Sequence, residues 1–113
     1  MWIFTQNGFI SAVRTEVGSQ DFIVRARDRK SLELIAEQAQ TDIVASPLAD
    51  YPYRVIVNEL VLGAYLMNEL AAVDYTNYKN QVALNRGYDF AKVCGSVWSI
   101  MHDVEDAEAR KRT

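Results

Sequence analysis

The regular alternation of side chains over residues 22–27 constrains the fold of this chain more than any other feature. Apolar residues take every second position, and two of the intervening residues are arginines: Phe22, Val24 and Ala26 alternate with Ile23, Arg25 and Arg27. A period of two is typical of a strand that buries one face and presents the other to solvent. Residues 15–21, which include Gly18 and Ser19, predict a hairpin turn before this strand.

Two further strands are predicted around this one. Residues 1–13 are rich in aromatic and β-branched side chains, and Gly8 among them favours a bend or a bulge. Residues 53–57 form the third strand, because Pro52 can stand at a strand start where no N–H donor is needed. The first two strands pair antiparallel through their hairpin. If the second and third strands are parallel, a right-handed crossover connects them.

The spacing of apolar residues predicts four helices. The first begins at Asp28, a favourable N-cap, and runs through Ala39 for about three turns. The second covers residues 59–73, with Asn58 as its cap. The third covers residues 78–86 and ends at Gly87, and the fourth covers residues 88–104. The segment before residue 50 lacks a clear period and contains Pro47, which predicts a loop with a short extended piece.

These elements predict a single α+β domain over residues 1–104. Its sheet has three mostly antiparallel strands, its helices lie on one face of the sheet, and the order is β-β-α-β-α-α-α. A chain of 113 residues has the length of one domain, and folding such a domain buries roughly two thirds of the surface of the unfolded chain. Residues 105–113 are charged and lack a cap, so we expect a frayed tail.

The composition excludes several classes of function. Cys94 and His102 are single residues of their types, so the chain can form neither an internal disulfide nor a thiolate or multi-histidine metal site. Five dispersed glycines give no phosphate-binding loop, and no nucleophile motif is present. Cys94 falls in the apolar stripe of the last helix, where a structural thiol is expected. We therefore predict no catalytic residue, no metal and no cofactor, and thus no enzyme.

Charge and hydropathy also limit where the protein acts. The net charge of −3 gives the whole molecule no attraction for nucleic acid or for an anionic membrane, so any such binding must be local. The chain shows no signal peptide, and its apolar run over residues 60–66 is far too short to span a bilayer. With a single cysteine, a reducing cytoplasm is the expected location.

The residues most suited to recognition are arginines and tyrosines near strand and helix ends. The candidate binding residues are Arg25, Arg27, Tyr51, Tyr53, Arg54, Tyr75 and Tyr78. Aromatic rings beside a basic sheet face can stack unpaired bases while guanidinium groups bind phosphates, which favours single-stranded nucleic-acid binding. The simpler alternative is that the arginines are the solvated side of a half-buried sheet and the tyrosines cover the edge of the core.

The predicted helix over residues 59–73 favours a different function. Its apolar side chains surround nearly the whole helix, so it needs partners on two sides. One side can be the sheet, and the other can be the C-terminal helices or a second copy of the chain. Tyr65, Met67 and Trp98 are residue types common in interfaces. Our main hypothesis is therefore a non-catalytic protein-interaction or regulatory module, which can form a dimer. The alternative is nucleic-acid binding.

Several short motifs also carry a resemblance to other proteins. They are Met1-Trp2-Ile3-Phe4-Thr5, Gly8-Phe9, Val24-Arg25-Ala26-Arg27, Asp50-Tyr51-Pro52-Tyr53-Arg54, Asp74-Tyr75 with Asn77 and Lys79, and Val97-Trp98. Together they span nearly the whole chain, which resembles a family of small uncharacterised bacterial proteins. The resemblance implies a compact stand-alone domain, and it implies no catalytic residue, cofactor or substrate.

Overall fold

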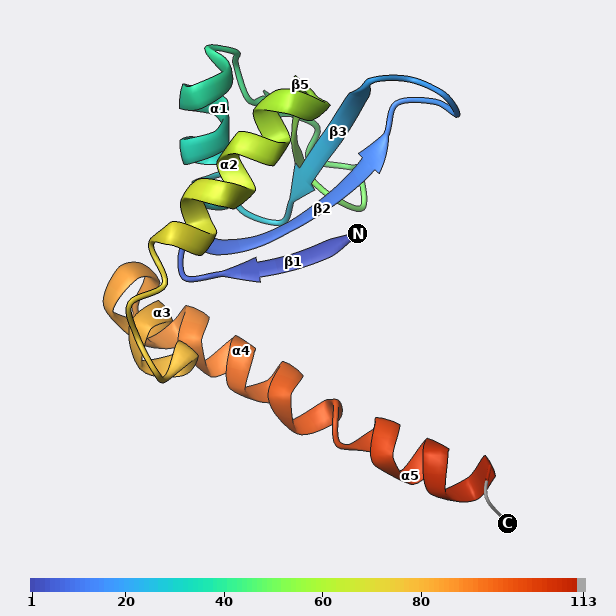
Figure 1. The fold of residues 1–113 in the computed structure, drawn as a ribbon, viewed down its shortest axis with the longest axis vertical. Coiled ribbons are helices and arrows are strands. Elements are labelled where there is room, and N and C mark those ends of the chain that lie inside the picture. Colours follow the sequence, from blue (N-terminus) through green and yellow to red (C-terminus); the bar gives the residue numbers. More distant parts are fainter. Residues whose placement is uncertain (112–113) are drawn as a thin grey trace. The chain divides into compact units, whose positions relative to one another are not determined.

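The computed structural model describes residues 1–111 and shows an α+β fold (Figure 1). The chain divides into two compact units, Met1–Asp74 and Tyr75–Thr113. The first unit contains the sheet with two helices, and the second unit is helical throughout its ordered elements. The sequence prediction of an α+β fold is confirmed at this level.

The first unit contains a five-stranded sheet in the order β1-β2-β3-β5-β4. Every neighbouring pair of strands is antiparallel. The strands are β1 (Trp2–Thr5), β2 (Gly8–Arg14), β3 (Asp21–Ala26), β4 (Val44–Ala45) and β5 (Tyr53–Asn58). A short 3₁₀ helix (Lys30–Leu32) and α1 (Glu33–Ala39) follow β3, and α2 (Glu59–Ala71) follows β5 directly.

The predicted three-stranded sheet is therefore wrong in its number of strands. The predicted first strand is in fact two strands, because the chain reverses between Thr5 and Gly8, which are paired in the register. The Asn7 backbone N–H donates to the Thr5 hydroxyl at 3.1 Å and stabilises this turn. Gly8 has a φ of +143°, which glycine adopts without a Cβ penalty, so it marks the start of a new strand and not a bulge.

The pairing of the two strands at the centre of the sheet differs from the parallel arrangement that the sequence left open. β3 and β5 are antiparallel, so the crossover expected for parallel strands does not occur. Between them lie the 3₁₀ helix, α1 and the two-residue strand β4, which pairs with the outer edge of β5. The first predicted helix is shorter than expected at its start, because Lys30–Leu32 form the 3₁₀ helix and α1 begins only at Glu33, so Asp28 is not its N-cap. Its end is as predicted, at Ala39, after which Gln40 adopts a left-handed conformation with φ of +52°.

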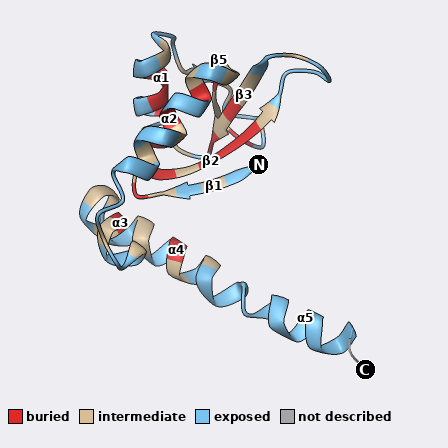
Figure 2. Ribbon diagram, in the orientation of Figure 1, coloured by how far each residue is buried: buried red, intermediate tan, exposed pale blue. Residues whose placement is uncertain are grey.

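The core of the first unit lies between the sheet and the helices α1 and α2. Figure 2 shows buried residues on the facing sides of these helices and on the central strands. Side chains from every layer form this core: Ile10, Ala12, Val24, Ala26, Leu32, Ile35, Ala36, Val55, Val57, Leu62 and Tyr65. Because these helices contact one side of the sheet, its outer face is the side that they leave uncovered.

The start of α2 is fixed by local interactions that the sequence indicates. The Asn58 side chain accepts a hydrogen bond from the Leu60 backbone N–H at 2.9 Å, as an N-cap does. Glu59 in the first turn pairs with Arg14 at 2.6 Å, which ties the helix to β2. Leu62 and Tyr65 are buried, whereas Leu60, Met67 and Leu70 are exposed. The helix therefore covers the core with only one of its apolar sides.

The second unit consists of α3 (Tyr78–Arg86), α4 (Tyr88–Ile100) and α5 (Asp103–Lys111). Asn77 caps α3 by accepting from the Asn80 backbone N–H at 2.9 Å. Gly87, with φ of +92°, makes the turn into α4, as the sequence predicted. The predicted fourth helix is interrupted after Ile100. Residues 105–111 of the predicted tail lie in α5, and residues 112–113 fall outside the described part of the chain.

Within residues 1–111, none of the helices is long and apolar enough to cross a bilayer.

Candidate functional site

The outer face of the sheet carries the residues that stand out as a candidate site. Side chains alternate along a strand, so Val24 and Val55 in the core place their neighbours on the opposite face. Arg25 of β3 is the register partner of Arg54 of β5. Partners in an antiparallel register share one face, and the two guanidinium groups therefore lie on the outer face beside each other.

Arg25 is held by neutral groups. Its Nη2 donates to the Ser11 hydroxyl at 2.9 Å, and its Cζ lies 4.5 Å from the centroid of the Tyr51 ring. The Nε atoms of Arg25 and Arg54 are buried, and neither has a hydrogen-bond partner among residues 1–111. Because the two Nε atoms are buried, a ligand can meet these side chains only through their terminal Nη groups.

Tyr51 connects the loop before β5 with the end of β3. Its ring lies between Arg25 and Arg27, whose Cζ atom is 4.6 Å from the ring centroid. Arg27 also donates to the Asp50 carbonyl oxygen at 2.8 Å and lies 3.4 Å from the Asp50 carboxylate. Only 6% of Tyr51 is exposed. Its ring therefore positions the two arginine side chains by cation–π contact and offers little surface for a ligand.

Aromatic residues of β1 and β2 extend the outer face. The rings of Phe4 and Phe9 are stacked with centroids 4.5 Å apart, and Trp2 meets Phe9 edge to face at 5.9 Å. Trp2 is 73% exposed although it belongs to this cluster. The sequence analysis did not select these rings as site residues. The alternation of Trp2 and Phe4 in the first strand places both rings on one face. It indicates an aromatic cluster only once the turn before Gly8 is known, because that turn brings Phe9 beside them.

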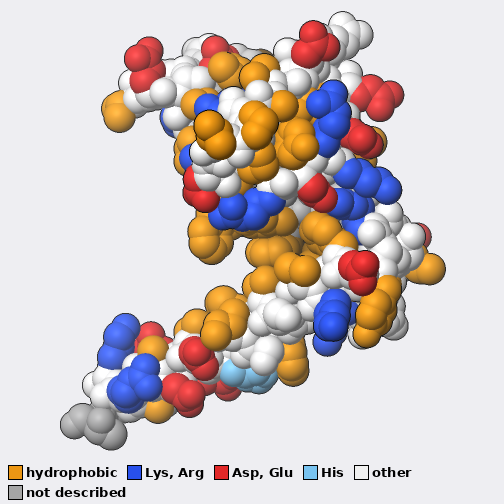
Figure 3. Space-filling model, turned by 180° about the vertical axis from the view of Figure 1, so that it is seen from behind, with side chains coloured by type: hydrophobic (Ala, Val, Ile, Leu, Met, Phe, Trp, Pro, Cys, Tyr) orange, Lys and Arg blue, Asp and Glu red, His pale blue; other side chains and the backbone are white. Residues whose placement is uncertain are grey.

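An aliphatic row lies next to the arginine pair. Val13, Ile23 and Ile56 are register partners across β2, β3 and β5, so their side chains also share the outer face. Ile56 is 57% exposed. We use the name outer-face patch for the residues of these rows: Trp2, Phe4, Phe9, Val13, Ile23, Arg25, Arg54 and Ile56. Figure 3 shows hydrophobic side chains and Lys or Arg side chains next to each other on the surface of the first unit.

The structure brings together four of the seven predicted site residues: Arg25, Arg27, Tyr51 and Arg54. Tyr53 does not join them. It pairs with Ala26 and packs against the core, so it projects from the face opposite to Arg54. The prediction that grouped Tyr53 with Arg54 overlooked the alternation of side chains along β5.

Tyr75 and Tyr78, the last two predicted site residues, belong to the second unit. The Tyr78 hydroxyl lies 3.8 Å from the sulfur of Cys94, a buried free cysteine of α4. Burial and the contact with Cys94 raise the pKa of Tyr78. This environment favours a neutral, structural phenol.

The other groups that the sequence analysis considered for chemistry are His102 and possible metal ligands. His102 pairs with Glu105 at 2.8 Å on the exposed side of the last helical segment. In the part of the chain that the structure describes, no three His, Cys, Asp or Glu residues are placed to hold a metal ion.

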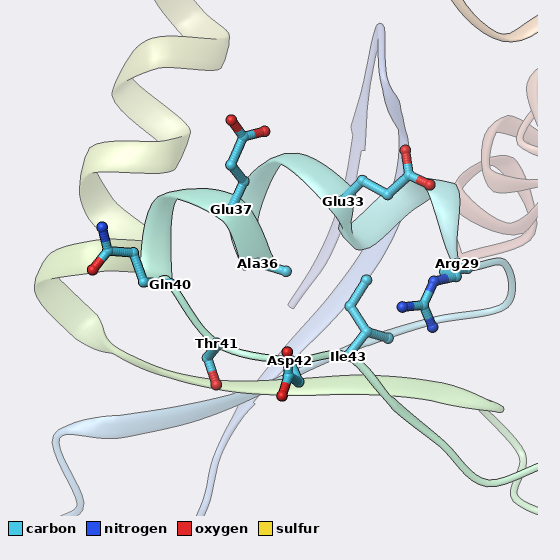
Figure 4. Close-up of a pocket in the computed structure, with 8 residues that line it drawn as sticks. All are labelled: Arg29, Glu33, Ala36, Glu37, Gln40, Thr41, Asp42 and Ile43. Carbon is cyan, nitrogen blue, oxygen red and sulfur yellow. The ribbon is translucent and has the colours of Figure 1, made fainter.

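An open hollow of about 450 Å³ lies beside α1. It is lined by Arg29, Glu33, Ala36, Glu37, Gln40, Thr41, Asp42 and Ile43 (Figure 4). In the close-up, the carboxylates of Glu33 and Glu37 point away from the segment that carries Asp42. The charged groups around the hollow therefore do not converge on one ligand position, and the outer-face patch is the better candidate site.

Comparisons with protein-family models, curated proteins and solved structures find no match for this chain. The resemblance to small bacterial proteins therefore stays a prediction. The function must be inferred from the chain's own surface.

Proposed function

We propose that this protein is a non-catalytic protein-interaction module that binds a partner through the outer-face patch. The observation that carries the proposal is the set of exposed aromatic and aliphatic side chains on a sheet face that α1 and α2 leave uncovered. Single exposed apolar residues are normal on soluble proteins, but rows of them on one face are typical of interaction surfaces. Trp2 and Arg25 are also residue types that dominate binding energies.

Site-specific photo-crosslinking tests this proposal. A photoreactive amino acid at Ile56 probes the outer-face patch, and the same amino acid at Val17 is the matched control. Val17 is an apolar residue that is fully exposed in the turn between β2 and β3. In the native host we expect one dominant crosslinked protein from position 56 and none from position 17. Equal products from both positions would contradict binding through this patch.

A second candidate function is single-stranded nucleic-acid binding through the same patch. It is supported by the Trp2, Phe4 and Phe9 rings beside two arginines that lack a carboxylate partner within residues 1–111. A salt titration distinguishes this candidate. Oligonucleotide binding that weakens steeply as salt rises supports it, and absence of binding at low salt removes it.

The partner can also be a second copy of the chain. In α4 of the second unit, Val93, Val97 and Ile100 follow at spacings of four and three residues, and Val93 and Ile100 are 61% and 62% exposed. This spacing places the three side chains on one helical side, as helix-to-helix association requires. Light scattering on concentrated protein tests self-association. A monomer that persists at high concentration would exclude the dimer.

A further inference from the structure

We infer that the segment recognised by the outer-face patch is an extended acidic peptide that carries a carboxylate and, two residues away, an aliphatic side chain. This inference rests on the proposed protein-binding function and specifies the chemistry of the partner. It follows from the unpaired charge of Arg25 and Arg54, from the apolar row beside them and from the spacing between the two.

The first step is the difference between the arginines of the sheet. Arg14 pairs with Glu59 at 2.6 Å, and Arg27 lies 3.4 Å from the Asp50 carboxylate. Arg25 and Arg54 have no such acid within ion-pairing distance in the described residues. Charges that adjoin across two strands repel each other when both are positive. A bound carboxylate would relieve this repulsion.

The second step is the way in which the Arg25 side chain is held. The Nε atoms of Arg25 and Arg54 are buried, so a bound carboxylate would meet the terminal Nη groups. Tyr51 and Ser11 hold the Arg25 guanidinium, so its orientation does not have to be fixed at the moment of binding. Arginine binds carboxylates through paired N–H groups, which gives geometric specificity in addition to charge. Arg25 is therefore preorganised for a carboxylate, and Arg54 beside it supplies a second positive charge.

The third step is the apolar row next to this pair. Ile23 precedes Arg25 by two residues on β3, and Ile56 follows Arg54 by two residues on β5. Two residues of a strand span roughly 7 Å. A peptide in extended conformation has the same repeat, so an acidic residue over the arginines places the residue two positions away over Ile23 and Ile56. An aliphatic side chain fits that position.

The fourth step is the choice between a peptide and a nucleic acid. The first unit contains ten acidic and six basic side chains, so the unit as a whole repels a polyanion. A short peptide with one carboxylate needs only the local pair of cations. The aliphatic row of Val13, Ile23 and Ile56 offers no ring for base stacking and matches an apolar side chain. These features favour the peptide.

Amide chemical-shift titration of the full-length, isotope-labelled protein tests the inference. The probes are a capped hexapeptide Gly-Glu-Ser-Ile-Gly-Ser, its analogue with Gln in place of Glu, and a ten-residue oligothymidylate. We expect the acidic peptide to shift the amides of Ile23, Arg25, Arg54 and Ile56 in a saturable way. The Gln analogue should bind at least roughly tenfold more weakly, because a charge-assisted pair is lost.

Paired substitutions provide the matched control. The double variant Arg25→Gln with Arg54→Gln should lose the binding, whereas Arg29→Gln with Lys30→Gln changes the net charge equally at two exposed residues of another surface and should keep it. If the first variant does not fold, Arg25→Lys with Arg54→Lys replaces it, and binding should fall because the paired N–H geometry is lost.

Several outcomes would overturn the inference. Equal affinity for the Glu and Gln peptides would remove the carboxylate site, and tighter binding of oligothymidylate at the same amides would assign the patch to nucleic acid. Absence of shifts with all probes would also reject the acidic segment. The protein-binding function would then be judged separately by the crosslinks from Ile56, so failure of the partner's chemistry is distinguishable from failure of the function.

Discussion

The two units of this protein differ in how far they bury their own apolar side chains. The first unit encloses a continuous core between its sheet and α1 and α2. In the second unit, Val82 and Cys94 are the buried apolar residues among those described, whereas Leu84, Val93, Trp98, Ile100 and Met101 are exposed (Figure 2). Burial of apolar surface is the main source of folding free energy. The first unit therefore has the larger source of folding free energy, and the second has the smaller one.

The largest expected effect tests the core of the first unit. Leu62→Ala should lower the free energy of unfolding by roughly 2–5 kcal/mol, because it removes a side chain that is 3% exposed and leaves a cavity. Leu70→Ala is the matched control in the same helix, and this 66% exposed residue should cost less than about 0.5 kcal/mol. Denaturant unfolding measures both. Equal losses would show that α2 does not cover the core with one side.

Alkaline titration tests the same core through Tyr65. Burial and, to a smaller extent, the nearby Glu69 carboxylate raise the pKa of this phenol to about 12, although its hydrogen bond with Thr5 acts in the opposite direction. A raised folded-state pKa gives a stabilising contribution that is complete below about pH 10 and is lost as the pH rises toward 12. Each pKa unit corresponds to about 1.4 kcal/mol. Tyr65→Phe should flatten the fall of stability over this range, and an unchanged slope would contradict the prediction.

The corresponding substitution in the second unit is Val82→Ala. Val82 is fully buried in α3, so its truncation should cost roughly 2 kcal/mol within that unit. Amide hydrogen exchange should show faster exchange in α3 and α4 and little change in β2, β3 and β5. Faster exchange in the strands as well would mean that the two units unfold together and that their comparison as separate units fails.

A smaller effect compares equivalent helix caps in the two units. Asn58→Ala and Asn77→Ala each remove a side-chain oxygen that accepts a backbone N–H at 2.9 Å. Each should cost about 1 kcal/mol. Loss of the Asn58 cap should lower global stability, whereas loss of the Asn77 cap should speed hydrogen exchange only near the start of α3. If the Asn77 variant lowered global stability and the Asn58 variant had only a local effect, the second unit would be the more important for the stability of the whole chain.

The smallest expected effect concerns the ion pair of Arg14 and Glu59. Both side chains are nearly half exposed, so their pairing should contribute about 0.2–1 kcal/mol and should weaken with salt. A double-mutant cycle with Arg14→Gln and Glu59→Gln isolates this coupling. Arg14 also lies over the Phe22 ring, with 4.3 Å between its Cζ and the ring centroid, so the single Arg14 variant should lose more than the coupling alone.

Local signals in the sequence were sufficient for several elements. The alternation around Arg25 predicted β3, and Asn58 and Gly87 predicted helix boundaries that the structure has. Elements defined by partners far along the chain were missed. β4 is two residues long and exists as a strand only through its pairing with Arg54 and Tyr53 of β5, which no local pattern encodes.

The candidate site was predicted in part for the same reason. Arg25 and Arg54 could be selected by residue type, but their side-by-side position depends on the register of β3 and β5. Tyr51 lies against Arg25 and Arg27 because the loop before β5 folds back, and loop conformations of this kind leave little trace in the sequence. The aromatic part of the patch required the turn before Gly8, where the sequence analysis predicted a bend or a bulge within one strand.

The antiparallel pairing of β3 with β5 has a consequence for the kinetics of folding. β1, β2 and β3 are joined by short turns and can assemble from neighbouring residues. By contrast, Asp21 pairs with Asn58, and Ala26 pairs with Tyr53, across the connection that contains α1 and β4. Closing this long connection costs entropy before the contacts are made. The docking of β5 is thus the expected slow step, and the arginine pair forms only when that step is complete.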